Sequence, residues 1–303
     1  MAEPFLHAPY AEGRSLFSIG LAPLDLSQWI EVDDRLQAEL ALKETILASE
    51  GENAFAALPE SLAGQKETLS LLAAHLCSRF PDVYARDGDA IRILPAGRSL
   101  ALHAGEPLKT ASRLVQEDLL LMRRLARGWR LAAGSLCFPS SWRLSEKIGR
   151  ELESLHAPVP GFAGRTAAIL RRIFDNLKPE QPIERMNWSI YGDGELRHAV
   201  SGGDPGERFP ADRPIASIAH VRVERQTARK LPASGDILFT VRVHVDPIAM
   251  LERHKDGARL ARALCDQLSA LSAEQLAYKG LDHARGRLIE ALCALAGESV
   301  NAR

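Results

Sequence analysis

Cysteine is scarce in this sequence. Among 303 residues only four are cysteines, Cys77, Cys137, Cys265 and Cys293, and no two of them form a C-x-x-C pair. Such wide spacing excludes a zinc ribbon and the dense disulfide framework of small secreted domains. We therefore expect a protein of a reducing compartment.

Long apolar runs and an excess of charge of one sign are also lacking. No segment approaches the roughly 20 apolar residues of a membrane helix, and residues 1–10 lack a signal-peptide pattern. The 38 basic and 39 acidic residues leave a formal charge of −1, without the clustered basic face that binds nucleic acid. These absences predict a bacterial-type cytoplasmic protein with neither a membrane nor a nucleic-acid partner.

The common catalytic signatures are missing as well. There is no P-loop, no G-x-G-x-x-G after a strand, no H-E-x-x-H and no G-x-S-x-G. The composition is that of an ordinary globular protein, with 46% hydrophobic and 25% charged residues and no linker-like stretch. Simple nucleotide-binding, zinc-protease and serine-hydrolase functions are excluded, and one domain is expected.

Hydrophobic periodicity predicts an α+β fold. Helical spacing occurs in residues 33–49, 66–80, 114–127, 142–155, 166–177, 248–271 and 282–295. Strand-like runs occupy residues 91–94, 99–102, 129–138, 185–191, 216–226 and 237–245. This order predicts an antiparallel sheet of about five strands with inserted and flanking helices. We expect an N-terminal arm and helices over residues 1–85, a core over 86–246 and C-terminal helices over 247–303.

The last two strand-like runs predict a hairpin with one apolar and one polar face. Side chains alternate along residues 237–246, and the polar positions include Arg242 and His244. In the partner run the polar positions include Arg222 and Glu224. The polar face meets either water, which is the more common situation, or a charged ligand with Arg222 and Arg242 as counter-ions.

A series of short segments carries a resemblance to a known family. They are VQEDL (115–119), AGSLCFPSSW (133–142), EKIG (146–149), LHAPVPG (155–161), RMNWS (185–189), VERQT (223–227) and LFTVR (238–242). In this order and at this spacing, residues 114–242 resemble the haem-binding (alpha) subunit of the haem-dependent oxidative N-demethylase family. Looser similarity surrounds residues 20–24 and Trp29.

The resemblance implies both a fold and a reaction. The implied core is PAS-like (Per-ARNT-Sim), a five-stranded antiparallel sheet with helices around haem b, which agrees with the α+β prediction. The implied activity is that of an oxidoreductase of the monooxygenase type. The haem iron activates dioxygen with electrons from a separate NAD(P)H-dependent reductase, and a small methylated amine loses a methyl group as formaldehyde. A folate-binding subunit is a further implied partner.

Two residues are candidates for the axial ligand of the haem iron, which such a site requires. His156 stands first, because Pro158 and Pro160 restrict the backbone that follows it and so hold the imidazole in one orientation. The alternative for His156 is a helix-end histidine that hydrogen-bonds the last carbonyls. Cys137 is the second candidate, because a thiolate favours O–O cleavage, although its strand position suits a buried inert cysteine equally well.

Haem propionates require positive groups, and the candidates are Arg222, Arg225 and Arg242. Strand alternation points Arg222 and Arg225 to opposite faces unless a bulge intervenes. Glu224 is the natural cross-strand partner of Arg242, unless it serves the site itself.

An alkylammonium substrate favours a carboxylate, and the candidate catalytic residues are Glu117, Asp118 and Glu224. Glu117 and Asp118 have an alternative role as favourable charges at the start of the following apolar run. Two other function classes stay open: a PAS-like sensor of haem or a small ligand that does not turn over, and a scaffold subunit that has lost its cofactor.

Overall fold

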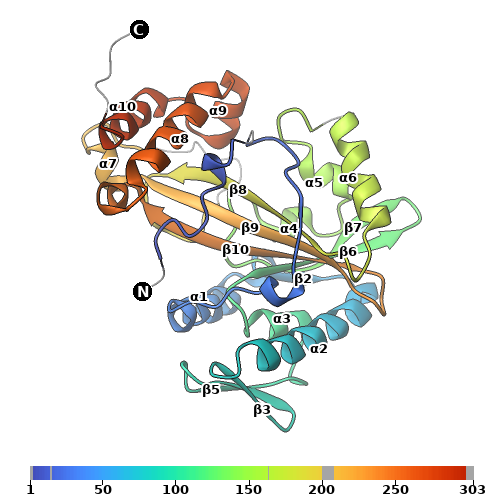
Figure 1. Ribbon diagram of the computed structural model, residues 1–303. Coiled ribbons are helices and arrows are strands. Elements are labelled where there is room, and N and C mark those ends of the chain that lie inside the picture. The colour runs from blue at the N-terminus through green and yellow to red at the C-terminus, as the bar shows by residue number, and fades with distance from the viewer. Residues whose placement is uncertain (1–2, 14–15, 163, 200–207, 298–303) are drawn as a thin grey trace.

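The computed structural model describes residues 3–13, 16–162, 164–199 and 208–297. Its centre is an antiparallel sheet of seven strands in the order β1-β8-β9-β10-β6-β7-β2 (Figure 1). In that order the strands are Ala22–Pro23, Ile183–Tyr191, His220–Lys230, Ile237–Pro247, Asp118–Leu125, Gly128–Ser135 and Phe55–Ala57. A smaller sheet contains β3 (Tyr84–Asp87), β4 (Ala90–Ile93) and β5 (Arg98–Ala101).

Helices surround the large sheet. Those before β8 are α1 (Leu36–Ser49), α2 (Leu62–Arg79), α3 (Pro107–Ser112), α4 (Leu144–Lys147), α5 (Leu152–His156) and α6 (Arg165–Asn176). Those after β8 are α7 (Ile215–Ile218), α8 (Gly257–Ala270), α9 (Ala273–Lys279) and α10 (Arg285–Leu295). Short 3-10 turns are η1 (Pro9–Ala11), η2 (Leu26–Gln28), η3 (Gly51–Asn53), η4 (Pro59–Ser61) and η5 (Ile248–Arg253). No helix in the described ranges has the length and apolar character needed to cross a membrane.

The α+β prediction is confirmed, but the expected five-stranded sheet is wrong in its strand number. Five long strands, β6 to β10, form the centre of the sheet, and β1 and β2 add short edges of two and three residues. Both edge strands come from the N-terminal 85 residues, which the sequence predicts to be arm and helices only. A run of two or three residues leaves no period in a sequence, so pairing that depends on distant strands goes undetected.

The two faces of the sheet are set by the register of β8, β9 and β10. On one face Glu224 pairs with Asn187, and Gln226 pairs with Arg185; we call this the Arg222 face. On the other, the Arg242 face, Arg242 and His244 of β10 lie opposite Arg225 and Val223 of β9. Because side chains alternate along a strand, the two sets point away from each other.

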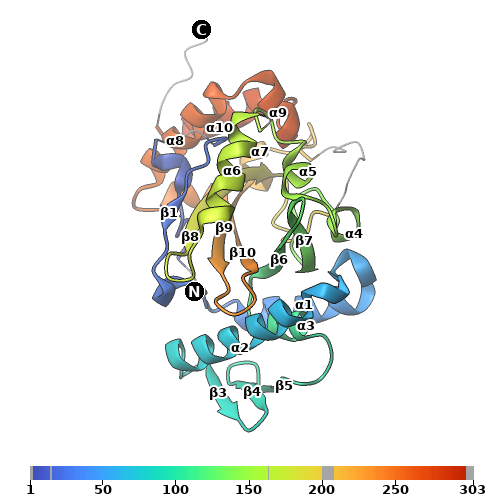
Figure 2. The same cartoon turned by 90° about the vertical axis from the view of Figure 1, so that its right-hand side faces the viewer.

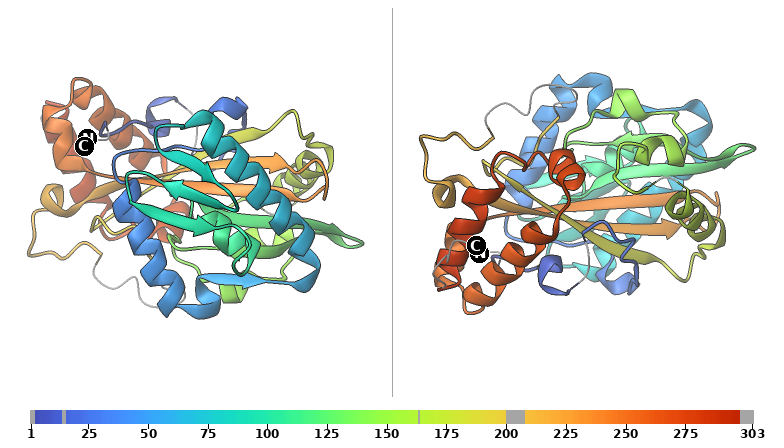
Figure 3. Two further views of the ribbon diagram at one scale, coloured as in Figure 1. Left: turned by 90° about the horizontal axis from the view of Figure 1, so that it is seen from below. Right: turned by 90° about the horizontal axis from the view of Figure 1, so that it is seen from above.

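Helices cover both faces. Helices α1, α2 and α3 pack on the Arg242 face around Leu119, Leu121 and Leu238, and they cross the sheet when it is viewed from below (Figure 3, left). On the Arg222 face, α4, α5 and α6 pack over Ala228 and Ile237, on the opposite side of the sheet from α1–α3 (Figure 2). Helices α8 and α10 close the other end of β8 and β9 in a separate cluster.

Several predicted elements are corrected. The helix predicted at 114–127 is strand β6, which pairs with both β10 and β7. The helix predicted at 142–155 is split into α4 and α5, because Gly149 adopts a φ of 76° between them. The helix predicted at 248–271 begins as the 3-10 turn η5 and becomes α-helical only at Gly257. Helices α1, α2, α6 and α10 lie where they are predicted.

Candidate functional site

A cluster of polar side chains occupies the middle of the Arg222 face. The Glu224 carboxylate accepts hydrogen bonds from Asn187 Nδ2 at 3.5 Å and from Gln226 Nε2 at 3.1 Å. Lys279, the last residue of α9, reaches β8. Its Nζ donates to Asn187 Oδ1 at 3.1 Å and to the Trp188 carbonyl at 2.9 Å. The C-terminal helices therefore contribute to a site built on β8 and β9.

Glu224 is an ionised carboxylate within this cluster. Burial raises the pKa of Glu224, but the positive charges of Arg222 and Lys279 outweigh burial and hold that pKa below its usual value. The Glu224 side chain is only 12% exposed, and Arg222 Nε lies 3.3 Å from its Oε1. The site thus contains one fixed negative charge flanked by cations.

Arg185 is a cation of this face with donors to spare. No described residue forms a hydrogen bond or an ion pair with its guanidinium, and its Nε is buried. Burial lowers the pKa of Arg185, opposed by the charge of Glu224. Arg185 is half-buried, and a buried Nε–H without a partner is costly, so the arrangement favours an anion or water beside this side chain.

A small cavity of about 160 Å³ lies where the N-terminal arm, the irregular segment of residues 1–30, crosses β8. It is lined by Glu12, Leu16, Ser18, Arg185, Trp188 and neighbouring residues. Sites for cofactor-sized ligands measure about 300–1,000 Å³, so this cavity by itself is too small for a macrocycle. It gives the Arg185 side chain a polar, water-accessible space at the edge of the sheet.

His156 ends α5, as its sequence context predicts. Its Nδ1 lies 2.9 Å from the Leu152 carbonyl, and its ring stacks on Phe162 with a centroid distance of 4.8 Å. Because a carbonyl only accepts, Nδ1 carries the hydrogen and Nε2 keeps its lone pair. Burial lowers the pKa of His156, and the charges of Arg185 and Lys147 lower it further. The imidazole is therefore neutral, oriented and able to bind a metal through Nε2.

One comparison with known proteins identifies the family. The sequence model of the family described as haem-dependent oxidative N-demethylase, alpha subunit-like, matches residues 20–289. The chain belongs to this family. The match confirms the resemblance inferred from the short segments, and it extends over both His156 and Arg185. The family is described as haem-dependent, and the term alpha subunit favours an enzyme of more than one subunit.

Against this family background, the three predicted propionate-binding arginines have different surroundings. Arg222 is 1% exposed, and its two terminal nitrogens donate to the Leu196 and Phe138 carbonyls at 2.8 and 2.7 Å. Arg242 lies on the other face, where it is paired with Glu39 at 2.7 Å and Asp33 at 2.8 Å. The guanidinium donors of Arg222 and Arg242 are therefore already bound by other residues of the protein.

Arg225 shares the Arg242 face. Its Nη2 lies 2.7 Å from Glu184 and also donates to the Gln28 carbonyl at 2.7 Å. The prediction that Arg222 and Arg225 point to opposite faces is confirmed, because no bulge interrupts the pairing of β9 with β8 and β10.

The hairpin prediction is corrected at two points. The register aligns Arg242 with Arg225 and Val243 with Glu224, so the hairpin has charged residues on both faces instead of one polar face. For the same reason Glu224 is not the cross-strand partner of Arg242, and it pairs with Arg222 on its own strand. Alternation within each strand was predictable, whereas the register between the strands was not.

The carboxylates Glu117 and Asp118 accept hydrogen bonds from backbone N–H groups near the start of β6 and the end of β7. Asp118 accepts the backbone N–H groups of Cys137 and Phe138 at 2.7 and 2.8 Å, and Glu117 Oε1 accepts that of Glu31 at 2.9 Å. Burial raises the pKa of Glu117 to about 7. The Cys137 thiol is fully buried, and burial raises its pKa to about 12, which disfavours a thiolate.

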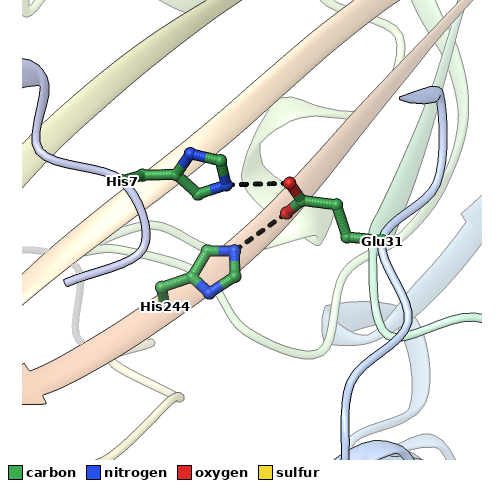
Figure 4. A group of neighbouring side chains, drawn as sticks. All are labelled: His7, Glu31 and His244. Atoms are coloured by element: carbon green, nitrogen blue, oxygen red, sulfur yellow. Dashed lines mark hydrogen bonds and ion pairs between the residues drawn. The ribbon is translucent and has the colours of Figure 1, made fainter. Parts of the chain in front are cut away.

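A second cluster, which the sequence did not predict, lies on the Arg242 face. Glu31 accepts hydrogen bonds from His7 Nε2 at 2.8 Å and from His244 Nε2 at 2.9 Å (Figure 4). The three residues come from the arm, from the segment before α1 and from β10, so no local spacing announces them. Their ligand-type atoms lie within 4.8 Å of one another, as the atoms of a metal centre do.

The surroundings of this cluster favour hydrogen bonds from the two histidines to Glu31 over the binding of a metal ion. Arg35 Nη2 lies 3.4 Å from His244 Nδ1, and since a guanidinium only donates, His244 carries its own hydrogen on Nε2 and gives it to Glu31. Metal-bound histidines instead donate from their second nitrogen. Arg225 Nε, 3.6 Å from Glu31, adds a further positive charge. The cluster therefore links the arm to the sheet.

Proposed function

We propose that this chain is the haem-binding subunit of an oxidative N-demethylase that removes a methyl group from a small methylated amine and releases formaldehyde. The proposal follows from family membership over residues 20–289. The observation that carries it is the half-buried Arg185 guanidinium, which has no partner among the described residues and lies on the sheet face that α5 covers.

In this proposal His156 Nε2 binds the iron of haem b, and Arg185 pairs with a propionate. Support comes from the free lone pair on Nε2 and from donors of Arg185 that no described residue uses. When bound, the haem supplies the activation of dioxygen. Arg222, Arg225 and Arg242 are weaker propionate partners because other residues already hold their guanidinium groups. Cys137 is a weaker ligand, since its pKa keeps it protonated.

Glu224 is the proposed recognition group for the alkylammonium substrate. It is ionised, partly exposed and located on the same face as Arg185. Lys279 limits the negative charge there, and burial lowers the pKa of Lys279 to about 8, so it is partly neutral in mildly alkaline solution. A carboxylate that holds an ammonium also keeps the methyl-bearing nitrogen in one orientation. Glu117 and Asp118 are proposed to act on stability alone, through the backbone groups they bind.

We further propose one domain in which residues 86–246 form the PAS-like haem-binding core and the terminal segments complete it. A separate NAD(P)H-dependent reductase supplies electrons, and a folate-binding subunit accepts the released one-carbon unit. These partners follow from the reaction and from the alpha-subunit name of the family.

The test is haem titration of the purified protein, followed by a formaldehyde assay with reductant, dioxygen and dimethylamine. We expect a Soret band that His156→Ala abolishes or shifts. Arg185→Gln should weaken haem binding about tenfold or more, because a charge-assisted pair is lost. The matched control is Arg171→Gln in α6. Arg171 is exposed and pairs with Glu153 of α5, so its loss should leave haem binding unchanged.

Three outcomes separate the alternatives. A wild-type protein that shows no Soret band with excess haem contradicts every haem function and leaves a scaffold subunit. Haem binding without formaldehyde from any methylamine tested favours a sensor. A Soret band that is unchanged in His156→Ala refutes the assignment of the ligand while leaving the haem function standing.

A further inference from the structure

Two cysteines that are distant in the sequence meet between α8 and α10. Cys265 Sγ and Cys293 Sγ lie 3.1 Å apart, and both thiols are free. The helices that carry them pack directly against each other in the cluster that closes the end of β8 and β9. A disulfide has an S–S bond of about 2.05 Å, so the sulfurs need to approach by only about 1 Å.

We propose that Cys265 and Cys293 form a dithiol that hydrogen peroxide converts reversibly into an intrachain disulfide. The proposal rests on no part of the proposed haem function. The other cysteines, Cys77 and Cys137, make no sulfur–sulfur contact with any described residue, so the reaction is specific to one pair.

The two thiols differ in a way that sets the order of the steps. Cys265 is 5% exposed, and burial together with the contact to Cys293 raises its pKa to about 11, so it forms little thiolate. Cys293 is half-buried and therefore more accessible to a small oxidant in solution. Cys293 reacts first and Cys265 is the resolving thiol.

The chemistry balances in two steps. The Cys293 sulfur attacks one peroxide oxygen, the O–O bond breaks, and the leaving hydroxide takes the thiol proton to form water as the sulfur becomes a sulfenic acid. The Cys265 sulfur then attacks the Cys293 sulfur, the S–O bond breaks, and the departing hydroxide takes the Cys265 proton to form a second water. Two thiols lose two electrons in all, and one peroxide molecule gains them.

The bond would fix the C-terminal helices to one another. It closes a loop that contains α9, whose last residue, Lys279, reaches Asn187 and the Trp188 carbonyl on the sheet. A disulfide restricts the unfolded chain. Closing a loop of this length should raise the unfolding temperature by roughly 5 °C for a protein of this size.

The experiment uses the full chain, reduced and then freed of reductant. It is treated with hydrogen peroxide, freed of peroxide, alkylated with N-ethylmaleimide in guanidinium chloride so that buried thiols also react, and digested with trypsin. We expect two of the four thiols to escape alkylation and the peptides 263–279 and 288–303 to appear joined by a disulfide. Dithiothreitol should restore four alkylated thiols, and peroxide treatment should raise the unfolding temperature.

Matched variants decide the outcome. Cys77→Ser should keep both the cross-link and the thermal shift, whereas Cys293→Ser should lose both, and Cys265→Ala should leave Cys293 to be oxidised alone. Four alkylated thiols after peroxide treatment would overturn the proposal. So would irreversible oxidation of Cys293 in the wild type, or a cross-link between two chains in place of the intrachain bond.

Discussion

An arginine of this protein can bind a ligand only if other residues of the protein leave some of its guanidinium N–H donors without a hydrogen-bond partner. Arg222 is buried on the same face of the sheet as Arg185, yet its guanidinium is held by the Leu196 and Phe138 carbonyls. Arg185, two strand positions from the Asn187 and Glu224 pair, keeps its donors free. The sequence points to Arg222 and not to Arg185, because it shows alternation along a strand but not which carbonyls from distant loops already bind an arginine.

Glu31 gives a prediction for a single residue. Glu31→Gln should lower the free energy of unfolding by about 1–3 kcal/mol at neutral pH, because hydrogen bonds to a charged acceptor become neutral ones. Burial raises the pKa of Glu31, but hydrogen bonds from His244 and His7 outweigh it and hold the pKa far below 4.5. Such a carboxylate contributes stability that is complete above pH 4.5 and is lost as the pH falls below it.

Urea unfolding of the wild type and Glu31→Gln at pH 7, 5 and 3 measures this effect. The difference between the two proteins should be largest at pH 7 and should shrink by pH 3. Glu60→Gln, an exposed acid in η4, is the control and should follow the wild type. A Glu31→Gln difference that stays constant with pH would show that the charge of Glu31 is not what links the arm to β10.

Secondary-structure elements differ in how well the sequence predicts them, for physical reasons. Strand β10 was predictable because apolar and polar residues alternate from Phe239 to Asp246. Strand β6 was not, because Asp118–Leu125 is largely buried on both sides and its leucines fit a helix equally well. The edge strands β1 and β2 depend wholly on partners distant in the sequence, so local patterns cannot reveal them.

The break between α4 and α5 gives a prediction about elements. Gly149 has a φ of 76°, which side chains with a Cβ rarely adopt, and an added methyl there would meet only Leu58 Cδ1 at 4.0 Å. Gly149→Ala should therefore destabilise the protein by about 1 kcal/mol through backbone strain alone. The matched control is Gly286→Ala in α10, which has open space and helical backbone and should stabilise by up to about 1 kcal/mol.

Chemical denaturation of both glycine variants measures the pair. Because Gly149 lies between the short helices that lead to His156, Gly149→Ala should also weaken haem binding if the proposed ligand is correct. Equal and opposite stability changes support the strained turn. Two alanine variants that both stabilise the protein would mean that residues 142–155 form one continuous helix, as the sequence predicts.

At the scale of the whole molecule, the N-terminal arm is part of the core. Tyr10 in η1 is 1% exposed and packs edge-on against Trp188 of β8 at 5.7 Å, within the cluster that contains α8 and α10. Residues 1–30 have no sustained period, so the sequence shows only an irregular segment there. Three regions of the chain, the arm, the sheet and the C-terminal helices, are thus joined at one buried point.

Two substitutions at Tyr10 test this connection. The Tyr10 hydroxyl is buried and makes no hydrogen bond with any described residue, so Tyr10→Phe should leave stability unchanged or raise it slightly. Tyr10→Ala removes the ring and should lower the free energy of unfolding by about 3–5 kcal/mol, with a red shift of tryptophan fluorescence as water reaches Trp188. If both variants behave alike in urea unfolding, the arm lies on the surface and does not hold the sheet to the C-terminal helices.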